Sequence, residues 1–135
     1  TGADHAPGRI IDVAGHPRIE DLYLAADVLV TDYSSAMFDY AVLDRPVVIY
    51  APDWEEYRTK RGTTFDLMAM PPGPVATSQP ALAQVLGARR PWDDESTALR
   101  AAFRARFCSL EDGKAADRVV HALWPAPPVA RGGPA

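Results

Sequence analysis

Residues 28–50 read VLVTDYSSAMFDYAVLDRPVVIY, and this stretch decides the fold. The continuous apolar run Val28-Leu29-Val30 predicts a short strand buried on both faces, as in a parallel sheet. A helical stretch beginning at about Ser34 follows, and the proline of Leu43-Asp44-Arg45-Pro46 ends it. The run Val47-Val48-Ile49-Tyr50 predicts a second buried strand. Strand, helix and strand in this order indicate a βαβ unit, and therefore an α/β fold with a parallel sheet.

Periodic segments on both sides extend this unit. Upstream, Ile10 to Val13 predicts a further short strand, and the spacing of Ile19, Leu22, Tyr23 and Ala26 predicts one face of a helix. Downstream, the pattern predicts a last strand at 75–76 and helices over 53–61, 78–86, 95–107 and 114–123. We therefore expect a loop or fragment edge over 1–9, a folded unit over 10–124 and a disordered, Pro/Gly-rich tail over 125–135.

Length and composition bound the class of protein. A chain of 135 residues is long enough for one domain and too short for a typical two-domain enzyme. The net charge of −4 argues against a nucleic-acid binder, which usually carries a basic excess. Cys108 is the only cysteine, which excludes a disulfide scaffold and a cysteine-rich zinc site. No apolar run approaches the roughly 20 residues of a membrane helix, so we expect peripheral membrane contact at most.

The most informative segment for function is Thr31 to Asp39. Ligands of open α/β sheets bind beyond the carboxyl ends of the strands, where this sequence places Asp32, Tyr33, Ser34 and Ser35. A helix start with two hydroxyl groups indicates a phosphate or pyrophosphate site, with Asp32 orienting the serines. The alternative is that Ser34 simply caps the helix. Asp39 has two interpretations as well, because its carboxylate fits either a ribose or polyol hydroxyl or a solvated helix surface.

Other chemical candidates are weaker. Arg58, Lys60 and Arg61 suit a diphosphate, although ion pairs with neighbouring glutamates explain them as well. His16 suits a general base, but a histidine in a Gly-His-Pro turn is more often structural or exposed. The arginines at 89–106 indicate either a weak membrane-surface patch or, as we prefer, solvated side chains flanking a core stripe. No metal-spaced cluster, Walker lysine motif or GxGxxG is present, so the sequence predicts no metal and no cofactor.

The stretch 21–41 resembles the CDP-glycerol glycerophosphotransferase family, the teichoic acid primases and polymerases. At its centre is the run Thr31-Asp32-Tyr33-Ser34-Ser35. The resemblance continues through later blocks in the same order and covers roughly 10–123. These blocks are Arg45-Pro46-Val47-Val48-Ile49-Tyr50, Asp53, Glu56-Tyr57-Arg58, Arg61-Gly62, Phe65-Asp66, Pro72-Gly73-Pro74, Phe107, Asp112-Gly113-Lys114-Ala115-Ala116 and Arg118-Val119-Val120. It implies a Rossmann-like parallel sheet with flanking helices, the C-terminal, donor-binding half of a two-domain GT-B glycosyltransferase.

The resemblance also implies an activity and site residues. Members transfer glycerol phosphate from CDP-glycerol to a lipid-linked poly(glycerol phosphate) acceptor at the cytoplasmic face of the bacterial membrane, attached peripherally, and release CMP. Ser34 and Ser35 would meet the donor phosphates, and Arg58 and Arg61 could face the diphosphate. Asp39 would take the ribose or polyol side, with Asp32 and Tyr33 in supporting positions.

The sequence departs from the family where catalysis is expected. The family's catalytic histidines lie upstream, neither is recognisable in this chain, and His16 is not assigned their role. The N-terminal half is also missing, so we expect a donor-binding half that is inactive alone. Two alternatives stay open: a GT-B half that uses CDP-ribitol or a UDP-sugar, and a non-catalytic nucleotide-binding or interaction module.

Overall fold

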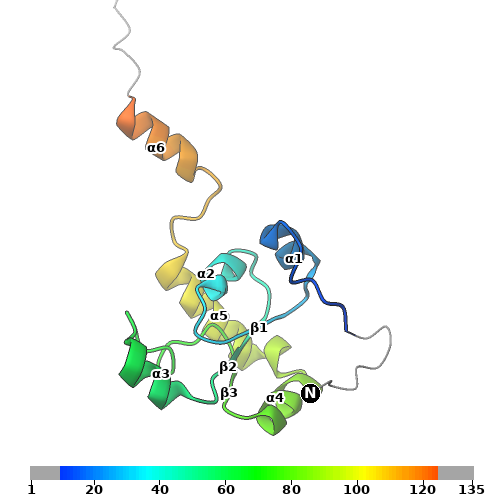
Figure 1. Cartoon of the computed structure of the whole chain (residues 1–135). Helices are drawn as coiled ribbons and strands as arrows, with labels where there is room; N and C mark the ends of the chain where they lie inside the picture. The colour runs from blue at the N-terminus through cyan, green and yellow to red at the C-terminus, as the bar shows by residue number, and fades with distance from the viewer. Residues whose placement is uncertain (1–9, 125–135) are drawn as a thin grey trace, which may run out of the picture.

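The computed structural model describes residues 10–124, and its centre is a three-stranded parallel sheet in the order β1-β2-β3. Figure 1 shows the elements in chain order around this sheet. They are α1 (Ile19–Ala25), β1 (Leu29–Thr31), α2 (Ala36–Ala41), β2 (Val47–Tyr50), α3 (Trp54–Arg61), β3 (Val75–Ala76), α4 (Gln79–Gly87), the 3₁₀ helix η1 (Arg90–Trp92), α5 (Asp94–Phe107) and α6 (Ala115–Leu123). The predicted α/β class and the βαβ order are confirmed.

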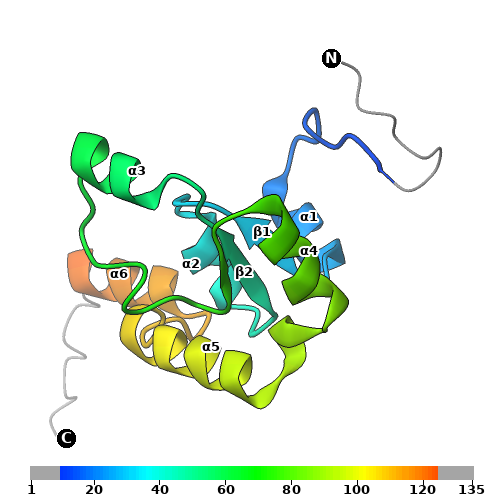
Figure 2. The same ribbon diagram turned by 90° about the horizontal axis from the view of Figure 1, so that it is seen from below.

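The core lies where α2 and α5 pack against one face of the sheet. The side chains of Val47 and Ile49 on β2 join Tyr40 of α2 and Phe103 of α5 in this cluster, all of them almost completely buried. Phe38 and Phe107 extend it, because their rings lie 5.3 Å apart in an edge-to-face arrangement. The predicted stripe on α5 therefore does face the core, and Figure 2 shows α5 lying alongside α2 and β2.

Helix starts follow the capping residues in the sequence. Ser78 Oγ accepts a hydrogen bond from the Ala81 N–H at 3.3 Å, as predicted for the start of α4. Asp93 Oδ1 accepts one from the Ser96 N–H at 2.8 Å and starts α5, which also lowers the pKa of the Asp93 carboxyl because the bond favours its charged form. These bonds occupy backbone donors that the helices themselves leave free.

Two strand predictions need correction. Residues 10–13 form no strand, and Ile10 and Ile11 are 60% and 79% exposed, because no neighbouring strand offers them hydrogen bonds. The strand β1 is not buried on both faces. Val30 pairs with the buried Val48 of β2 but is itself 41% exposed, because β1 is an edge strand whose second face is uncovered. The pattern of β2 is as predicted, since Val47, Val48 and Ile49 are all buried. The predicted loop at 1–9 and tail at 125–135 lie outside the described residues.

Candidate functional site

The loop between β1 and α2 carries the predicted phosphate site. Asp32 Oδ1 accepts a hydrogen bond from the Ser34 backbone N–H at 3.0 Å, and Ser34 Oγ accepts one from the Ala36 N–H at 3.2 Å. Asp32 thus shapes the loop, and Ser34 bonds within the turn that precedes α2 rather than at its N-cap position. Ser35 holds the N-cap position without a side-chain cap bond, and it is exposed.

Most backbone N–H groups at the start of α2 already donate hydrogen bonds within the protein. Those of Met37 and Phe38 donate to the carbonyls of Ser34 and Ser35, at 3.4 and 2.9 Å. With the bonds made by Asp32 and Ser34, they close a tight turn ahead of a helix of only six residues. Few backbone N–H groups are therefore free to bind a ligand at this helix start. An anion at this point would be held mainly by the hydroxyl groups of the two serines.

Tyr33 ties this loop to α3. Its hydroxyl donates to Asp53 Oδ1 at 2.8 Å, and its ring stacks on that of Tyr57 with centroids 4.0 Å apart. Trp54 lies on the same cluster, 5.6 Å from Tyr33. Burial, then the hydrogen bond to Asp53, raises the pKa of the Tyr33 phenol well above its usual range. Asp53 holds the N-cap position of α3, but its side chain makes no cap bond and instead accepts from the Tyr33 hydroxyl.

Two hollows flank the loop at the carboxyl end of the sheet. One, of about 230 Å³, is lined by Ser35 and by aromatic side chains that include Tyr33, Trp54 and Tyr57, and Gly62 to Phe65 close its far side. The other, of about 330 Å³, is lined by Val30, Thr31, Asp32 and Tyr50. The loop therefore presents Ser35 to one cavity and Asp32 to the other.

The cations of α3 divide into paired and unpaired groups. Arg58 Nη2 lies 2.7 Å from Glu55 Oε2, and Lys60 Nζ lies 2.5 Å from Glu56 Oε1, so the ion-pair interpretation describes both residues. Among the described residues no ion pair forms at Arg61, the last residue of α3. Arg61 directly precedes Gly62 to Thr64, which line the Ser35 cavity. Neither Arg61 nor Arg58 lines that cavity itself, and the predicted phosphate contacts of both arginines stay predictions.

Asp39 is not brought together with the serines. It lines a separate groove of about 510 Å³ between α1, α2 and the end of α5, whose walls include Tyr23, Phe38 and Phe107. The carboxylate of Asp39 contributes to a raised pKa of the Tyr23 phenol, for which burial is the larger cause. The predicted ribose contact of Asp39 stays a prediction, and it requires a donor that reaches from one cavity to the other.

The remaining candidates are explained by local pairing. His16 Nε2 lies 3.4 Å from Asp21 Oδ2 at the surface, and neither His16 nor His121 lines the Ser35 cavity. The arginines of α5 were expected to be solvated, which is wrong for two of them. Arg100 and Arg104 bind the carboxylate of Asp44 at 3.0 and 2.9 Å and so fix α5 to the turn before β2.

Arg45 has a structural role that the sequence did not predict. Its Nη1 donates to the carbonyls of Leu24 and Ala26 at 2.7 Å each and to that of Tyr23 at 3.3 Å, which satisfies the free end of α1. Tyr40 Oη adds a bond to the Ala26 carbonyl at 2.9 Å. The only sequence signal was a cation directly before Pro46 and a buried strand, and that spacing does not identify a helix 20 residues upstream.

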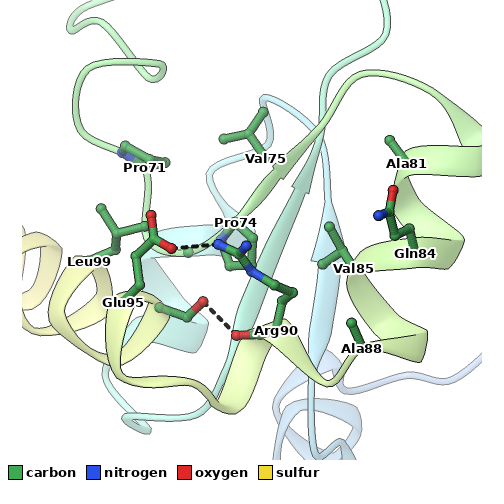
Figure 3. Close-up of a pocket in the computed structure, with 12 residues that line it drawn as sticks. Pro71, Pro74, Val75, Ala81, Gln84, Val85, Ala88, Arg90, Glu95 and Leu99 are labelled. Carbon is green, nitrogen blue, oxygen red and sulfur yellow. Dashed lines mark hydrogen bonds and ion pairs between the residues drawn. The ribbon is translucent and has the colours of Figure 1, made fainter.

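The cavity at the opposite end of the sheet holds no predicted residue. It measures about 440 Å³ and lies between β3, α4, η1 and α5, as Figure 3 shows. Arg90 Nη2 reaches Glu95 Oε2 at 2.5 Å, and Ser96 Oγ donates to the Arg90 carbonyl at 2.6 Å (Figure 3). Two of its polar contacts thus join η1 to α5, Gln84 of α4 adds a polar side chain, and Val75 and Val85 are among its apolar walls.

Comparison with known proteins gives these residues a context. Residues 2–125 match the family described as CDP-Glycerol:Poly(glycerophosphate) glycerophosphotransferase. The chain belongs to this family. A teichoic acid glycerol-phosphate transferase of Staphylococcus aureus is 40% identical over 125 residues, which make up 92% of this chain and 32% of that protein. A teichoic acid poly(glycerol phosphate) polymerase of Bacillus subtilis is 36% identical over 121 residues, 88% of this chain and 16% of that protein.

Solved structures agree with the family assignment. The wall teichoic acid polymerase TagF superposes with a TM-score of 0.71 at 35% identity, over 84% of this chain and 28% of that one. A histidine variant of TagF, soaked with CDPG, matches equally well. The predicted α/β fold, matching part of a GT-B-like enzyme, is confirmed, and the chain spans about a third or less of the length of these relatives. Within residues 10–124 no helix is long and apolar enough to cross a membrane.

Proposed function

We propose that this chain supplies the donor-binding part of a transferase that moves glycerol phosphate from CDP-glycerol to a lipid-linked poly(glycerol phosphate) in teichoic acid biosynthesis. The observation that carries the proposal is the match to TagF, a family member soaked with CDPG, in both sequence and fold. The exposed Ser35 at the carboxyl end of a parallel strand supports it, since ligands of such sheets bind at that edge. The enzyme would work peripherally at the cytoplasmic side of the bacterial membrane.

The reaction sets clear requirements for the site. A hydroxyl oxygen of the acceptor attacks the β-phosphorus of CDP-glycerol, the bond from that phosphorus to the bridging oxygen breaks, and CMP leaves with the electron pair. The proton of the attacking hydroxyl passes to a base. Hydroxyl groups of Ser34 and Ser35 and the guanidinium of Arg61 would offset negative charge on the phosphates. No described histidine lines the Ser35 cavity, so we infer that the base comes from an N-terminal half that partners this one.

The fluorescence of the chain's own tryptophan residues can be used to measure donor binding. Trp54 lines the Ser35 cavity, so titration with CDP-glycerol should change tryptophan fluorescence. Replacing Ser34 and Ser35 together with Ala should weaken binding about tenfold or more, because each lost bond to a charged group is worth about 1.5–3 kcal/mol. Ser109→Ala, an exposed serine in the segment after α5, is the control. Unchanged affinity in the double variant would contradict the assignment of a phosphate site to this loop.

The cations of α3 provide a second, matched test. Arg61→Ala should weaken CDP-glycerol binding, whereas Lys60→Ala should not, because Lys60 already pairs with Glu56 on the same helix. Both residues are exposed, so neither variant should disturb folding. Equal losses in the two variants would indicate general attraction to a basic helix rather than a phosphate contact.

Turnover separates binding from catalysis. We expect the 135-residue chain to bind CDP-glycerol without releasing CMP. Transfer of glycerol phosphate to an acceptor, with release of CMP, by this chain alone would contradict the assignment of the base to another half. CDP-ribitol is the second candidate donor, because a ribitol-phosphate primase of Bacillus spizizenii is 32% identical over 111 residues. Competition among CDP-glycerol, CDP-ribitol and a UDP-sugar ranks the donors, and no binding of any of them would favour an interaction module.

A further inference from the structure

The described residues that line the Ser35 cavity all have side chains that are uncharged at neutral pH. The cavity measures about 230 Å³, and its walls combine Ser35, Thr63 and Thr64 with aromatic and aliphatic side chains. The cations Arg58 and Arg61 of α3 lie outside this lining. A charged group that entered the cavity would lose water without gaining a partner of opposite charge, so the cavity favours an uncharged part of a ligand.

The aromatic rings of this lining already pack on one another. Tyr33 stacks on Tyr57 with centroids 4.0 Å apart, and the ring of Trp54 lies 5.6 Å from that of Tyr33. Phe38 and Phe65 meet edge to face with centroids 5.9 Å apart. The rings therefore form the walls of the cavity, and much of the ring surface that a nucleobase would need for stacking is used within the protein.

Three exposed hydroxyl groups in the lining are available to a ligand. They belong to Ser35, Thr63 and Thr64, and within the described part of the chain none of these side chains forms a hydrogen bond. Each hydroxyl group can donate one hydrogen bond and accept others. The hydroxyl groups of a small polyol have the same capacity, so an uncharged polyol matches what this lining offers.

The loop that carries the two threonines is anchored at both ends. Gly62 follows α3 with a φ of +72°, a conformation that glycine adopts without strain and that turns the chain away from the helix axis. Phe65 then packs on Phe107 of α5 with ring centroids 4.9 Å apart, and Leu67 is almost completely buried. Thr63 and Thr64 lie between these fixed points, so their hydroxyl groups need little ordering when a ligand binds.

We propose that the glyceryl group of the donor enters the Ser35 cavity, where Thr63 and Thr64 form hydrogen bonds with its hydroxyl groups. The inference rests on the proposed function, which places the donor phosphates at Ser34 and Ser35. In CDP-glycerol the glyceryl group is bonded to one end of the diphosphate and cytidine to the other, so a phosphate at Ser35 brings the glyceryl group to the mouth of this cavity. The two threonines are then residues that determine specificity for the polyol, whereas Ser34 acts on the phosphates.

Titration calorimetry of the 135-residue chain with CDP-glycerol and with CDP tests the inference, because CDP lacks only the glyceryl group. The double variant Thr63→Val, Thr64→Val keeps the side-chain shape and removes both hydroxyl groups. It should weaken binding of CDP-glycerol about fivefold or more and leave binding of CDP unchanged. The double variant Thr63→Ser, Thr64→Ser keeps the hydroxyl groups and should bind both as wild type does. Thr59→Val is the control, since the Thr59 hydroxyl donates to the Glu55 carbonyl within α3.

Two results would overturn this inference and leave the proposed function standing. Equal losses for CDP-glycerol and CDP in the valine variant would place the threonines at the nucleotide rather than at the polyol. Unchanged binding of both, in a valine variant that is folded by circular dichroism, would show that the threonines do not touch the donor. A wild-type chain that binds neither CDP-glycerol nor CDP would contradict the proposed function, and this inference with it.

Discussion

Replacing Gly73 with Ala should destabilise the fold more than any surface substitution. A Cβ built on Gly73 would lie 2.0 Å from the carbonyl oxygen of Val47, the first residue of β2, whereas ordinary contacts begin at 3.4 Å. The two backbones would have to separate by more than an ångström. The neighbouring Pro74 carbonyl accepts from the Ile49 N–H at 2.9 Å, so that movement would strain the pairing of β2 with β3.

The size of the effect follows from which atoms collide. Overpacking that flexible side chains can relieve costs about 1–3 kcal/mol. At Gly73 the added Cβ would collide with the backbone of Val47 in a paired strand, and the neighbouring Pro72 is buried. Neither segment can move easily, so little of the collision can be relieved. We expect a loss of about 3 kcal/mol or more, a large part of the ~5–15 kcal/mol that stabilises a typical domain. That loss lowers the Tm by roughly 15 °C for a unit of about 100 residues.

Gly87→Ala provides the matched control. Gly87 ends α4, and nothing lies within 4 Å of the Cβ that alanine would add. Helix propensity alone predicts a gain of up to about 1 kcal/mol. Urea unfolding, followed by tryptophan fluorescence and far-UV circular dichroism, measures both variants. A Gly73→Ala chain within about 1 kcal/mol of wild type would show that β2 and the Pro-Gly-Pro loop are less tightly joined than the 2.0 Å approach requires.

Three further predictions concern protonation and helix capping. Burial raises the pKa of Tyr23, Tyr33 and Tyr40 above 10.0, so the folded chain holds these protons more tightly than the unfolded one. The contribution of these three phenols to stability should be constant below about pH 10 and should be lost above it. Tyr33→Phe should make the fall in urea midpoint above about pH 10 shallower, and an unchanged slope would be the contrary result. Arg45→Met should lower the free energy of unfolding in urea by about 2 kcal/mol, because it removes the hydrogen bonds at the end of α1. The control Arg18→Met, at an exposed residue, should lower it by less than about 1 kcal/mol. Similar losses in the two variants would refute the capping role of Arg45. Burial also raises the pKa of the Cys108 thiol, so a disulfide reagent at pH 8 should modify it several times more slowly in the native chain than in urea, and equal rates would contradict that burial.

The sequence predicted the elements well because its signals for them are local. Ser78 and Asp93 start helices through bonds to residues three positions on, and Val47 to Ile49 form a buried strand because all three are apolar. Val30 shows the limit of such signals. Its run resembles that of β2, but whether a strand face is covered depends on distant elements, and β1 lies at the edge of the sheet.

The candidate site was predictable only in part, for the same reason. The position of Ser34 and Ser35 beyond a strand follows from chain order, whereas the separation of Asp39 from Ser35 follows from how α2 is rotated against α1 and α5. The hydrogen-bond partner of Asp53 could not be predicted from the sequence either. A local rule assigns its carboxylate to the start of α3, but Tyr33 reaches it from 20 residues upstream.

The roles in the loop between β1 and α2 can therefore be separated by residue. Asp32 and Tyr33 bond to the protein itself, through the Ser34 N–H and Asp53, so their substitution should weaken both folding and ligand binding. Ser35 makes no side-chain cap bond and is exposed, so its hydroxyl adds little to stability. A residue whose loss weakens donor binding while leaving the unfolding free energy unchanged is one that acts on the ligand. Ser35 is the residue of this loop from which the structure leads us to expect that combination. Ser34, whose hydroxyl accepts a hydrogen bond from the Ala36 N–H, should show a mixture of the two effects.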